Sequence, residues 1–379
     1  MRMTAVALVV LALAGSATGA GTDQRVAFVH GGNLVVANLA TGAQQVVLTH
    51  AALGPVAWSG DGKLVSDGGR IADGPALPTS ALSWAPTGET AAFIATDGSV
   101  RLWTTGAGQR TILPNAWGAR SLAWGPGGQL AVARTLYVRG PMRARHEEIW
   151  VWRAGALRRV IGPMTVDTVP IVAGFAPNGR VLWWSDEQGS ASIAADGLPL
   201  LAGKTALATT LVFPDFVDVC GPHLVYVRGG SRYTTYGKSI VEDGRNISSD
   251  TKLSWVSPSC SGTTVVAAAG RNWNETFMGR GEERSIWRLE PAKVRLTHPP
   301  KGWTDEDPRV LPGGSVLFVR THQTIAKDTT TEHASLDLLA QGTLKPIASL
   351  TTTVDELTTR WEPNYYGHYG WPSLIAVAP

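Results

Sequence analysis

The chain has 379 residues, and 33 Lys and Arg against 30 Asp and Glu give it a formal charge of only +3. A balance so close to neutral argues against nucleic-acid binding, which we therefore do not expect. The length suits two average domains or one large repeat fold. The 43 glycines and 15 tryptophans favour many short strands over long helices.

Residues 1–20 have the layout of a cleavable export signal. Arg2 precedes an unbroken apolar run, Ala5–Ala14, and small residues follow it. The run is too short to span a bilayer, and nothing downstream approaches the ~18 apolar residues that a membrane helix needs. We expect residues 21–379 to form one exported domain that is periplasmic, associated with the cell wall or extracellular. The alternative is an uncleaved N-terminal anchor.

A recurring phrase runs along the predicted mature chain: an apolar strand ending near an aromatic residue, a turn of Pro, Gly and Asp, and a second apolar strand. Clear copies are VAWSGDGKLVS from Val56, LSWAPTGETAAFI from Leu82, LAWGPGGQLAVA from Leu122 and AGFAPNGRVLWW from Ala173, and more degenerate copies begin at Asp218, Trp255 and Arg309. Glycine supplies the positive φ of a tight turn and proline presets its entry. Each phrase therefore predicts two antiparallel strands, A and B.

A second hairpin, strands C and D, follows each phrase, and units of roughly 40 residues with four strands predict an all-β fold, a β-propeller. Counting the C–D hairpins gives eight blades, although the unit at residues 55–80 is short enough to leave seven open. The unit from Arg25 has strands B, C and D but no strand A. The C-terminal segment WPSLIAVAP, from Trp371, can supply that strand and close the ring.

The turn sequences resemble the repeat of the TolB-like family of propellers, also called WD40-like or PD40 repeats. The resemblance is carried by WSGDGK at Trp58, WAPTGE at Trp84, WGPGGQ at Trp124 and FAPNGR at Phe175. It implies a propeller that serves as a binding scaffold, without the N-terminal domain of TolB itself. Because three tryptophans recur at one repeat position, we expect them to pack in the core.

The sequence lacks the common linear motifs of catalysis and of cofactor binding. It has no G-x-S-x-G elbow, no HExxH, no paired CxxC and no Walker loop, so we expect no cofactor and favour a non-enzymatic role. The acidic stretch Asp305–Asp307 could bind calcium, but we interpret it as a solvated inter-blade turn. The eight histidines show no pair at ligand spacing. The alternative function is a metal-dependent, lactonase-like hydrolase with carboxylates from several blades at the central channel.

Four B–C loops are expanded, around Val138, Val227, Gly270 and Arg320, and they should project from one face of the disc. They are basic and aromatic, which suits a protein or anionic envelope component as partner. The predicted partner-binding residues are Arg139, Arg143, Arg145, Arg228, Arg232, Tyr233, Tyr236, Arg271, Trp273 and Arg280. In the alternative, these arginines pair with Glu147, Glu148, Glu282 and Glu283 and only solvate the rim.

The two cysteines, Cys220 and Cys260, occupy equivalent A–B turn positions in consecutive repeats. In an oxidising compartment they are candidates for one structural disulfide, which would join neighbouring blades on the face opposite the long loops. The alternative is two free buried thiols.

Overall fold

The computed structural model describes most of the repeat region. It covers residues 24–51, 55–79, 82–114, 119–137, 145–164, 171–187, 190–195, 208–210, 217–229, 238–250, 252–271, 283–326, 329–350, 352–353 and 374–379. The predicted export signal lies outside these ranges. Among the described residues, no helix has the length and apolar character needed to cross a membrane.

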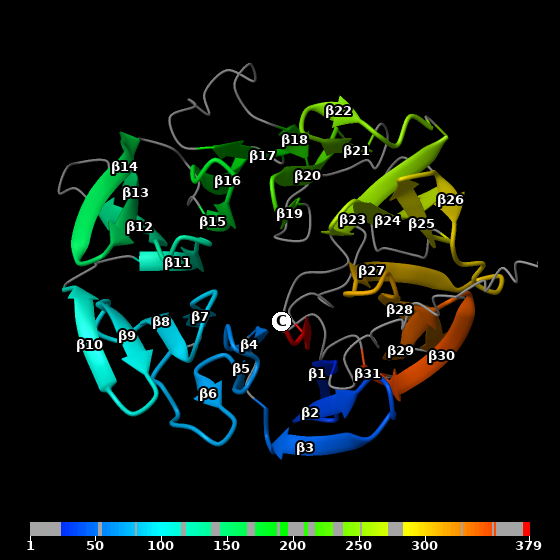
Figure 1. Cartoon of the computed structure of the whole chain (residues 1–379), viewed down its shortest axis with the longest axis horizontal. Coiled ribbons are helices and arrows are strands. Elements are labelled where there is room, and N and C mark those ends of the chain that lie inside the picture. Colours follow the sequence, from blue (N-terminus) through cyan, green and yellow to red (C-terminus); the bar gives the residue numbers. More distant parts are fainter. Residues whose placement is uncertain are drawn as a thin grey trace, which may run out of the picture.

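The strands form small antiparallel sheets arranged in a ring, and the first strand of each repeat lies nearest the axis (Figure 1). Seven sheets contain a four-stranded path, one of them with β31 (Thr352–Thr353) paired to β29, and an eighth sheet, β4-β5-β6, has three strands. The fold is therefore the predicted all-β propeller. The short unit at residues 55–80 is the reduced sheet, in which a single bridge between Arg70 and Ala76 stands where the fourth strand would be.

Three sheets make up the first part of the ring. One contains β32 (Ile375–Val377), β1 (Arg25–His30), β2 (Asn33–Asn38) and β3 (Gln44–Leu48). The reduced sheet contains β4 (Val56–Trp58), β5 (Val65–Asp67) and β6 (Arg70–Ile71). The next contains β7 (Leu82–Trp84), β8 (Thr90–Ile94), β9 (Val100–Thr104) and β10 (Gly108–Leu113).

The other five sheets follow in chain order. Two contain β11 (Ala119–Trp124), β12 (Leu130–Tyr137), β13 (Arg145–Arg153) and β14 (Ala156–Met164), and then β15 (Ile171–Phe175), β16 (Val181–Glu187), β17 (Ser190–Ala195) and β18 (Ala208–Thr210). Two more contain β19 (Val217–Cys220), β20 (His223–Arg228), β21 (Ser239–Glu242) and β22 (Arg245–Asn246), and then β23 (Leu253–Ser261), β24 (Thr264–Arg271), β25 (Ser285–Glu290) and β26 (Val294–Arg295). The last contains β27 (Thr304–Val310), β28 (Val316–Ala326), β29 (Thr329–Ala340) and β30 (Thr343–Ser349).

The C-terminal strand closes the ring as predicted. β32 pairs antiparallel with β1, with Val26 opposite Val377 and Phe28 opposite Ile375. It therefore supplies the inner strand that the N-terminal repeat lacks. The first blade is built from both ends of the described chain, so closing it joins the two ends of the ring.

The recurring tryptophans hold each inner strand against the preceding sheet. The indole N–H of Trp58 donates to the Ala376 carbonyl at 3.0 Å, and that of Trp124 donates to the Ser83 carbonyl at 2.9 Å. Trp84 donates to the Ser66 hydroxyl at 3.0 Å. In each case the acceptor belongs to the sheet before. The predicted packing role is confirmed, and the polar end of each ring adds a bond between blades.

Hydrophobic clusters fill the spaces between neighbouring sheets. One joins the β32–β3 blade to the reduced sheet and to the β27–β30 blade, and includes Phe28, Trp58 and Leu336. Another joins the β19–β22, β23–β26 and β27–β30 blades around Trp255 and Phe318. Because each sheet buries its faces against its neighbours, the ring is held together by inter-blade contacts.

Candidate binding face

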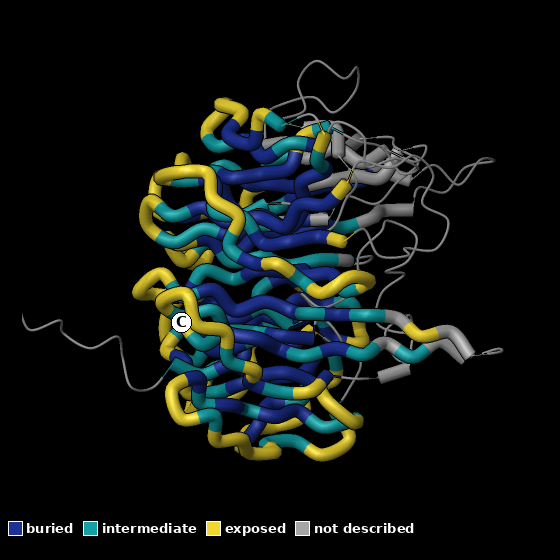
Figure 2. Tube along the Cα trace, turned by 90° about the vertical axis from the view of Figure 1, so that its right-hand side faces the viewer, coloured by how far each residue is buried: buried dark blue, intermediate teal, exposed yellow. Residues whose placement is uncertain are grey.

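The two faces of the disc differ in the length of their connections. Turns between first and second strands and between third and fourth strands lie on one face, here called the turn face. Connections between second and third strands lie on the other, here called the long-loop face. Exposed turns line the left side of Figure 2, and an arm extends beyond the other strands on the right. This arm is the β28–β29 hairpin, whose strands have 11 and 12 residues.

Of the predicted partner-binding residues, Arg228 and Arg271 have described side chains, and both are exposed. Each is the last residue of a second strand, Arg228 in β20 and Arg271 in β24. Because the two blades repeat the same path, both arginines lie at the long-loop face, in consecutive blades. Arg145 is the first residue of β13. The other predicted residues, Arg139, Arg143, Arg232, Tyr233, Tyr236, Trp273 and Arg280, lie outside the described residues.

Glu147 and Glu148, which the alternative placed in a solvated loop, lie inside β13 and are buried. The Glu148 carboxylate accepts hydrogen bonds from Arg134 and Arg159, each at 2.9 Å, and from the Trp150 indole at 2.8 Å. Burial alone would raise the pKa of Glu148, but these bonds outweigh it and lower the pKa. Glu148 therefore neutralises strand arginines within its own sheet.

The acidic stretch Asp305–Asp307 is also not a solvated turn, which corrects the sequence interpretation. It forms part of the inner strand β27 and is buried. Arg320, which faces Asp305 across the strand pair, donates to both of its carboxylate oxygens at 2.7 and 2.9 Å. Arg284 donates to Glu306 at 3.0 Å. Acidic residues can occupy a buried strand here because Arg320 of the next strand and Arg284, just before β25, compensate their charge.

Asp307 stands at an irregularity of this strand. Its φ is 48°, the register of β27 shifts between Glu306 and Arg309, and the Arg309 guanidinium lies 2.8 Å from its carboxylate. Burial raises the pKa of Asp307. Among the described inner strands, Asp and Glu occur only in β19 and β27. Each of these acids accepts a hydrogen bond from the protein or, for Asp307, lies at ion-pair distance from an arginine.

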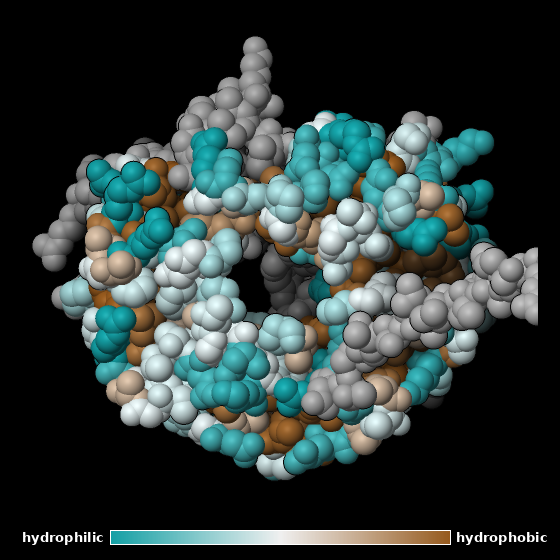
Figure 3. All heavy atoms as spheres, in the orientation of Figure 1, coloured by the Kyte–Doolittle hydropathy of each residue, from teal (hydrophilic) through white to brown (hydrophobic). Residues whose placement is uncertain are grey.

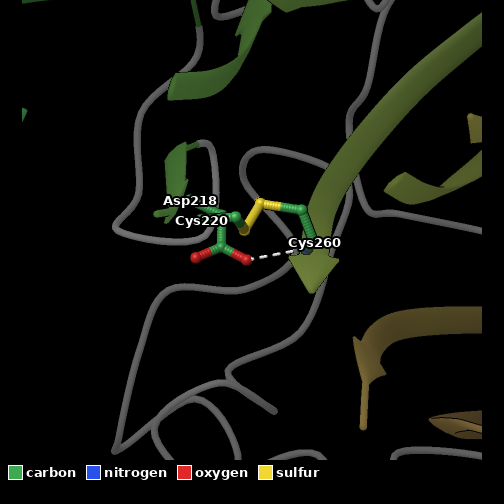
Figure 4. A group of neighbouring side chains, drawn as sticks. All are labelled: Asp218, Cys220 and Cys260. Atoms are coloured by element: carbon green, nitrogen blue, oxygen red, sulfur yellow. Dashed lines mark hydrogen bonds between the residues drawn. A yellow bond between two sulfur atoms is a disulfide. The ribbon is translucent and has the colours of Figure 1, made fainter. Parts of the chain in front are cut away.

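One group of described residues has metal-ligand composition: Asp218, Cys220 and Cys260. The two cysteines form a disulfide (Figure 4), so they offer no thiolate. An Asp218 oxygen accepts the Cys260 backbone N–H at 2.9 Å. The bond repeats a pattern of this ring, since Ser121 accepts from Val172 N–H and Ser259 accepts from Val310 N–H between other inner strands. The predicted structural disulfide between consecutive blades is confirmed, and Asp218 has a structural role beside it.

A row of three rings on the long-loop face was not predicted from the sequence. His322 in β28 lies opposite His333 in β29, and their ring centroids are 6.3 Å apart. Trp303, immediately before β27, stacks on His322 with a centroid separation of 5.3 Å. The two histidines have no ligand spacing along the chain because they meet only through the register of the hairpin. Two histidines flanking a hairpin turn would have been the available signal.

No protein-family model matches the chain, and no curated protein matches it. The TolB-like resemblance therefore remains a prediction. Among solved structures, the chain is similar to an acylaminoacyl peptidase of Pyrococcus horikoshii, with a TM-score of 0.47 and 11% identity over 86% of this chain and 53% of that chain. It therefore spans about half the length of that peptidase.

Two further structures match with comparable identity. The β-propeller domain of the trilobed protease from Pyrococcus furiosus has a TM-score of 0.36 and 11% identity over 72% of this chain and 95% of that chain. A streptogramin B lyase has a TM-score of 0.31 and 10% identity over 78% of this chain and 90% of that chain. At such low identity these likenesses concern the fold alone, and they assign no activity to this chain.

Proposed function

We propose that this chain is an exported propeller scaffold that binds a protein or another envelope component carrying anionic groups, through its long-loop face. The observation that carries the proposal is the placement of Arg228 and Arg271. Both are exposed, and both end equivalent strands of consecutive blades at the face from which the β28–β29 hairpin extends. Guanidinium groups bind carboxylate and phosphate groups through paired N–H donors.

The charge distribution of the described residues supports this choice over the channel-carboxylate hydrolase. The turn face is hollowed at the ring axis (Figure 3). The inner-strand carboxylates, however, come from only two of the described blades, and Asp305 and Glu306 are paired with Arg320 and Arg284. A carboxylate that already accepts two guanidinium bonds is a poor ligand for an additional cation. Export is supported by the disulfide, which is typical of oxidising compartments.

The test compares the predicted mature protein with an R228A/R271A variant on immobilised dextran sulfate, polyglutamate and uncharged dextran. We expect the mature protein to bind the two polyanions and the double variant to lose most of that binding. Binding should weaken as salt is added, because exposed charge contacts are screened. A control variant, R153A/R245A, removes two exposed arginines at turns on the opposite face and should bind as the wild type does.

Equal retention of all three proteins would contradict the proposal, as would binding of the mature protein to uncharged dextran. If the polyanions bind as expected, the natural partner can be identified among the components of an envelope fraction that the mature protein recovers and R228A/R271A does not. Mass determination of the N-terminus of the secreted protein tests export separately, and we expect it to begin near Gly21.

A further inference from the structure

The β28–β29 arm carries a polar surface that the proposed function does not yet use. His322, His333 and Trp303 are each partly exposed and form the row of rings described above. The row lies on the long-loop face, where Arg228 and Arg271 also lie. It is contributed by three parts of the last blade: the connection into β27, β28 and β29.

Each imidazole is anchored through one nitrogen. His322 Nδ1 lies 2.8 Å from the Gly302 carbonyl oxygen and donates to it, because a carbonyl can only accept. His333 Nε2 shares a 2.8 Å hydrogen bond with the Thr324 hydroxyl. The remaining nitrogens, Nε2 of His322 and Nδ1 of His333, have no bond to another described residue. The anchors fix both rings and leave one nitrogen of each for a ligand.

Two described acids near the rings are paired with arginines. On β27 and β28, Asp305 is paired with Arg320 below the rings, and at the neighbouring blade Glu306 is paired with Arg284. Burial raises the pKa of Asp337 on β29.

Two exposed charges flank the row among the side chains that the structure describes. Lys301 lies two residues before Trp303, and Glu283 accepts the Gly302 N–H at 3.2 Å. These opposite charges balance each other. Among the described residues of this surface, the two imidazoles are the groups that add positive charge when they are protonated.

We propose that His322 and His333, in their protonated form and backed by Trp303, bind an oxyanion group of the partner. This inference rests on the proposed function, because it assigns a second contact for the same anionic ligand. Each protonated ring offers one N–H beyond its anchoring bond, so two donors from facing strands can bind one phosphate or carboxylate group. Binding takes up protons, so affinity rises as the pH falls through the range in which imidazole is protonated.

The experiment follows the ring resonances of His322 and His333 in the mature protein while inorganic phosphate, or acetate as the carboxylate arm, is added. Below about pH 6 we expect the resonances of both rings to shift on addition of the anion. H322Q/H333Q is the test variant, and H223Q, on the turn face, is the matched control. Retention on dextran sulfate should rise about tenfold between about pH 7.5 and pH 5.5 for the wild type and H223Q. Retention of H322Q/H333Q should change little.

The outcomes separate this inference from the proposed function. Retention can depend on Arg228 and Arg271 and yet change equally with pH in the wild type and in H322Q/H333Q. That result overturns the histidine site and supports the arginine face. The histidine site is also overturned if the ring resonances do not shift with phosphate or with acetate, independently of the retention on dextran sulfate. Resonances that respond to zinc ions and not to the anions would make the pair a metal site and overturn the oxyanion assignment. If the wild type is not retained on dextran sulfate but its ring resonances still shift with phosphate or acetate, the arginine face is contradicted. The oxyanion site at His322 and His333 is then supported on its own.

Discussion

The turn face and the long-loop face are built from the same repeat but are held by different interactions. On the turn face, short connections bring backbones into close contact, and Cys220 and Cys260 are covalently joined. The guanidinium of Arg245, which pairs with Glu242 and Glu290 on this face, is exposed. On the long-loop face, β28 and β29 extend outward over the buried pair of Arg320 and Asp305. Short turns and a covalent bond therefore stabilise the turn face, while compensation of buried charge stabilises the long-loop face.

The largest effect should come from breaking the buried pair. R320A leaves the Asp305 carboxylate buried without its guanidinium, and we expect it to lower the free energy of unfolding by about 3–5 kcal/mol. The Arg320 side chain is 15% exposed and that of Asp305 is fully buried. Urea unfolding monitored by tryptophan fluorescence measures the change.

Two controls sharpen this result. R245A removes a guanidinium whose side chain is 62% exposed, and it should change stability far less. The double variant R320M/D305L replaces the pair with apolar side chains and should recover most of the lost stability. If R320A and R245A lower the free energy of unfolding equally, burial of the ion pair does not account for a difference in stability between the two faces.

On the turn face, the disulfide should have the next largest effect. It closes a segment with a sequence separation of 40 residues between Cys220 and Cys260. Loss of that constraint on the unfolded chain predicts that C220S/C260S is about 4 kcal/mol less stable. The S259A variant, which loses only the hydrogen bond between β23 and β27, is the control and should lose about 1 kcal/mol. Identical unfolding midpoints for the oxidised wild type and C220S/C260S would refute this role.

Close backbone approach on the turn face can be tested at Gly60. A Cβ at this position would lie 2.3–2.5 Å from backbone atoms of Ala85, Pro86 and Thr87 in the next blade. We therefore expect G60A to cost about 2–3 kcal/mol through overpacking. In G88A the added Cβ meets nothing within 4 Å, and only the positive φ of 68° is strained. That variant should cost about 1 kcal/mol. Thermal unfolding that ranks G88A below G60A in stability would contradict the contact.

The features that the sequence predicted correctly are those set by local rules or by repetition. The WSGDGK-type turns, the packing of Trp58, Trp84 and Trp124, and the equivalence of Cys220 and Cys260 all follow from aligning one repeat with the next. Ring closure by β32 follows from the strand that the first repeat lacks. A repeat fold makes such inferences possible because each unit has the same neighbours.

The features that the sequence did not predict depend on partners distant in the chain. The sequence predicts a solvated inter-blade turn at Asp305 and Glu306, but both residues are buried in a strand. Their burial depends on Arg320 and Arg284, which are placed by strand register and by the packing of two blades. The facing of His322 and His333 likewise depends on the register of one long hairpin.

The smallest effect concerns pH on the turn face. His223 Nδ1 lies 2.7 Å from the Asp243 carboxylate, and this hydrogen bond raises the pKa of His223 above its ordinary value of 6.5. A group whose pKa is higher in the folded protein stabilises the fold fully below its unfolded pKa, and the contribution is lost as the pH rises through the folded pKa. The wild type should therefore lose slightly more stability than H223Q between about pH 6 and pH 8, because glutamine does not titrate in that range. Urea midpoints of both proteins across this range measure the difference. Parallel curves would mean that the exposed pair is too weakly formed in solution to distinguish the two faces by pH.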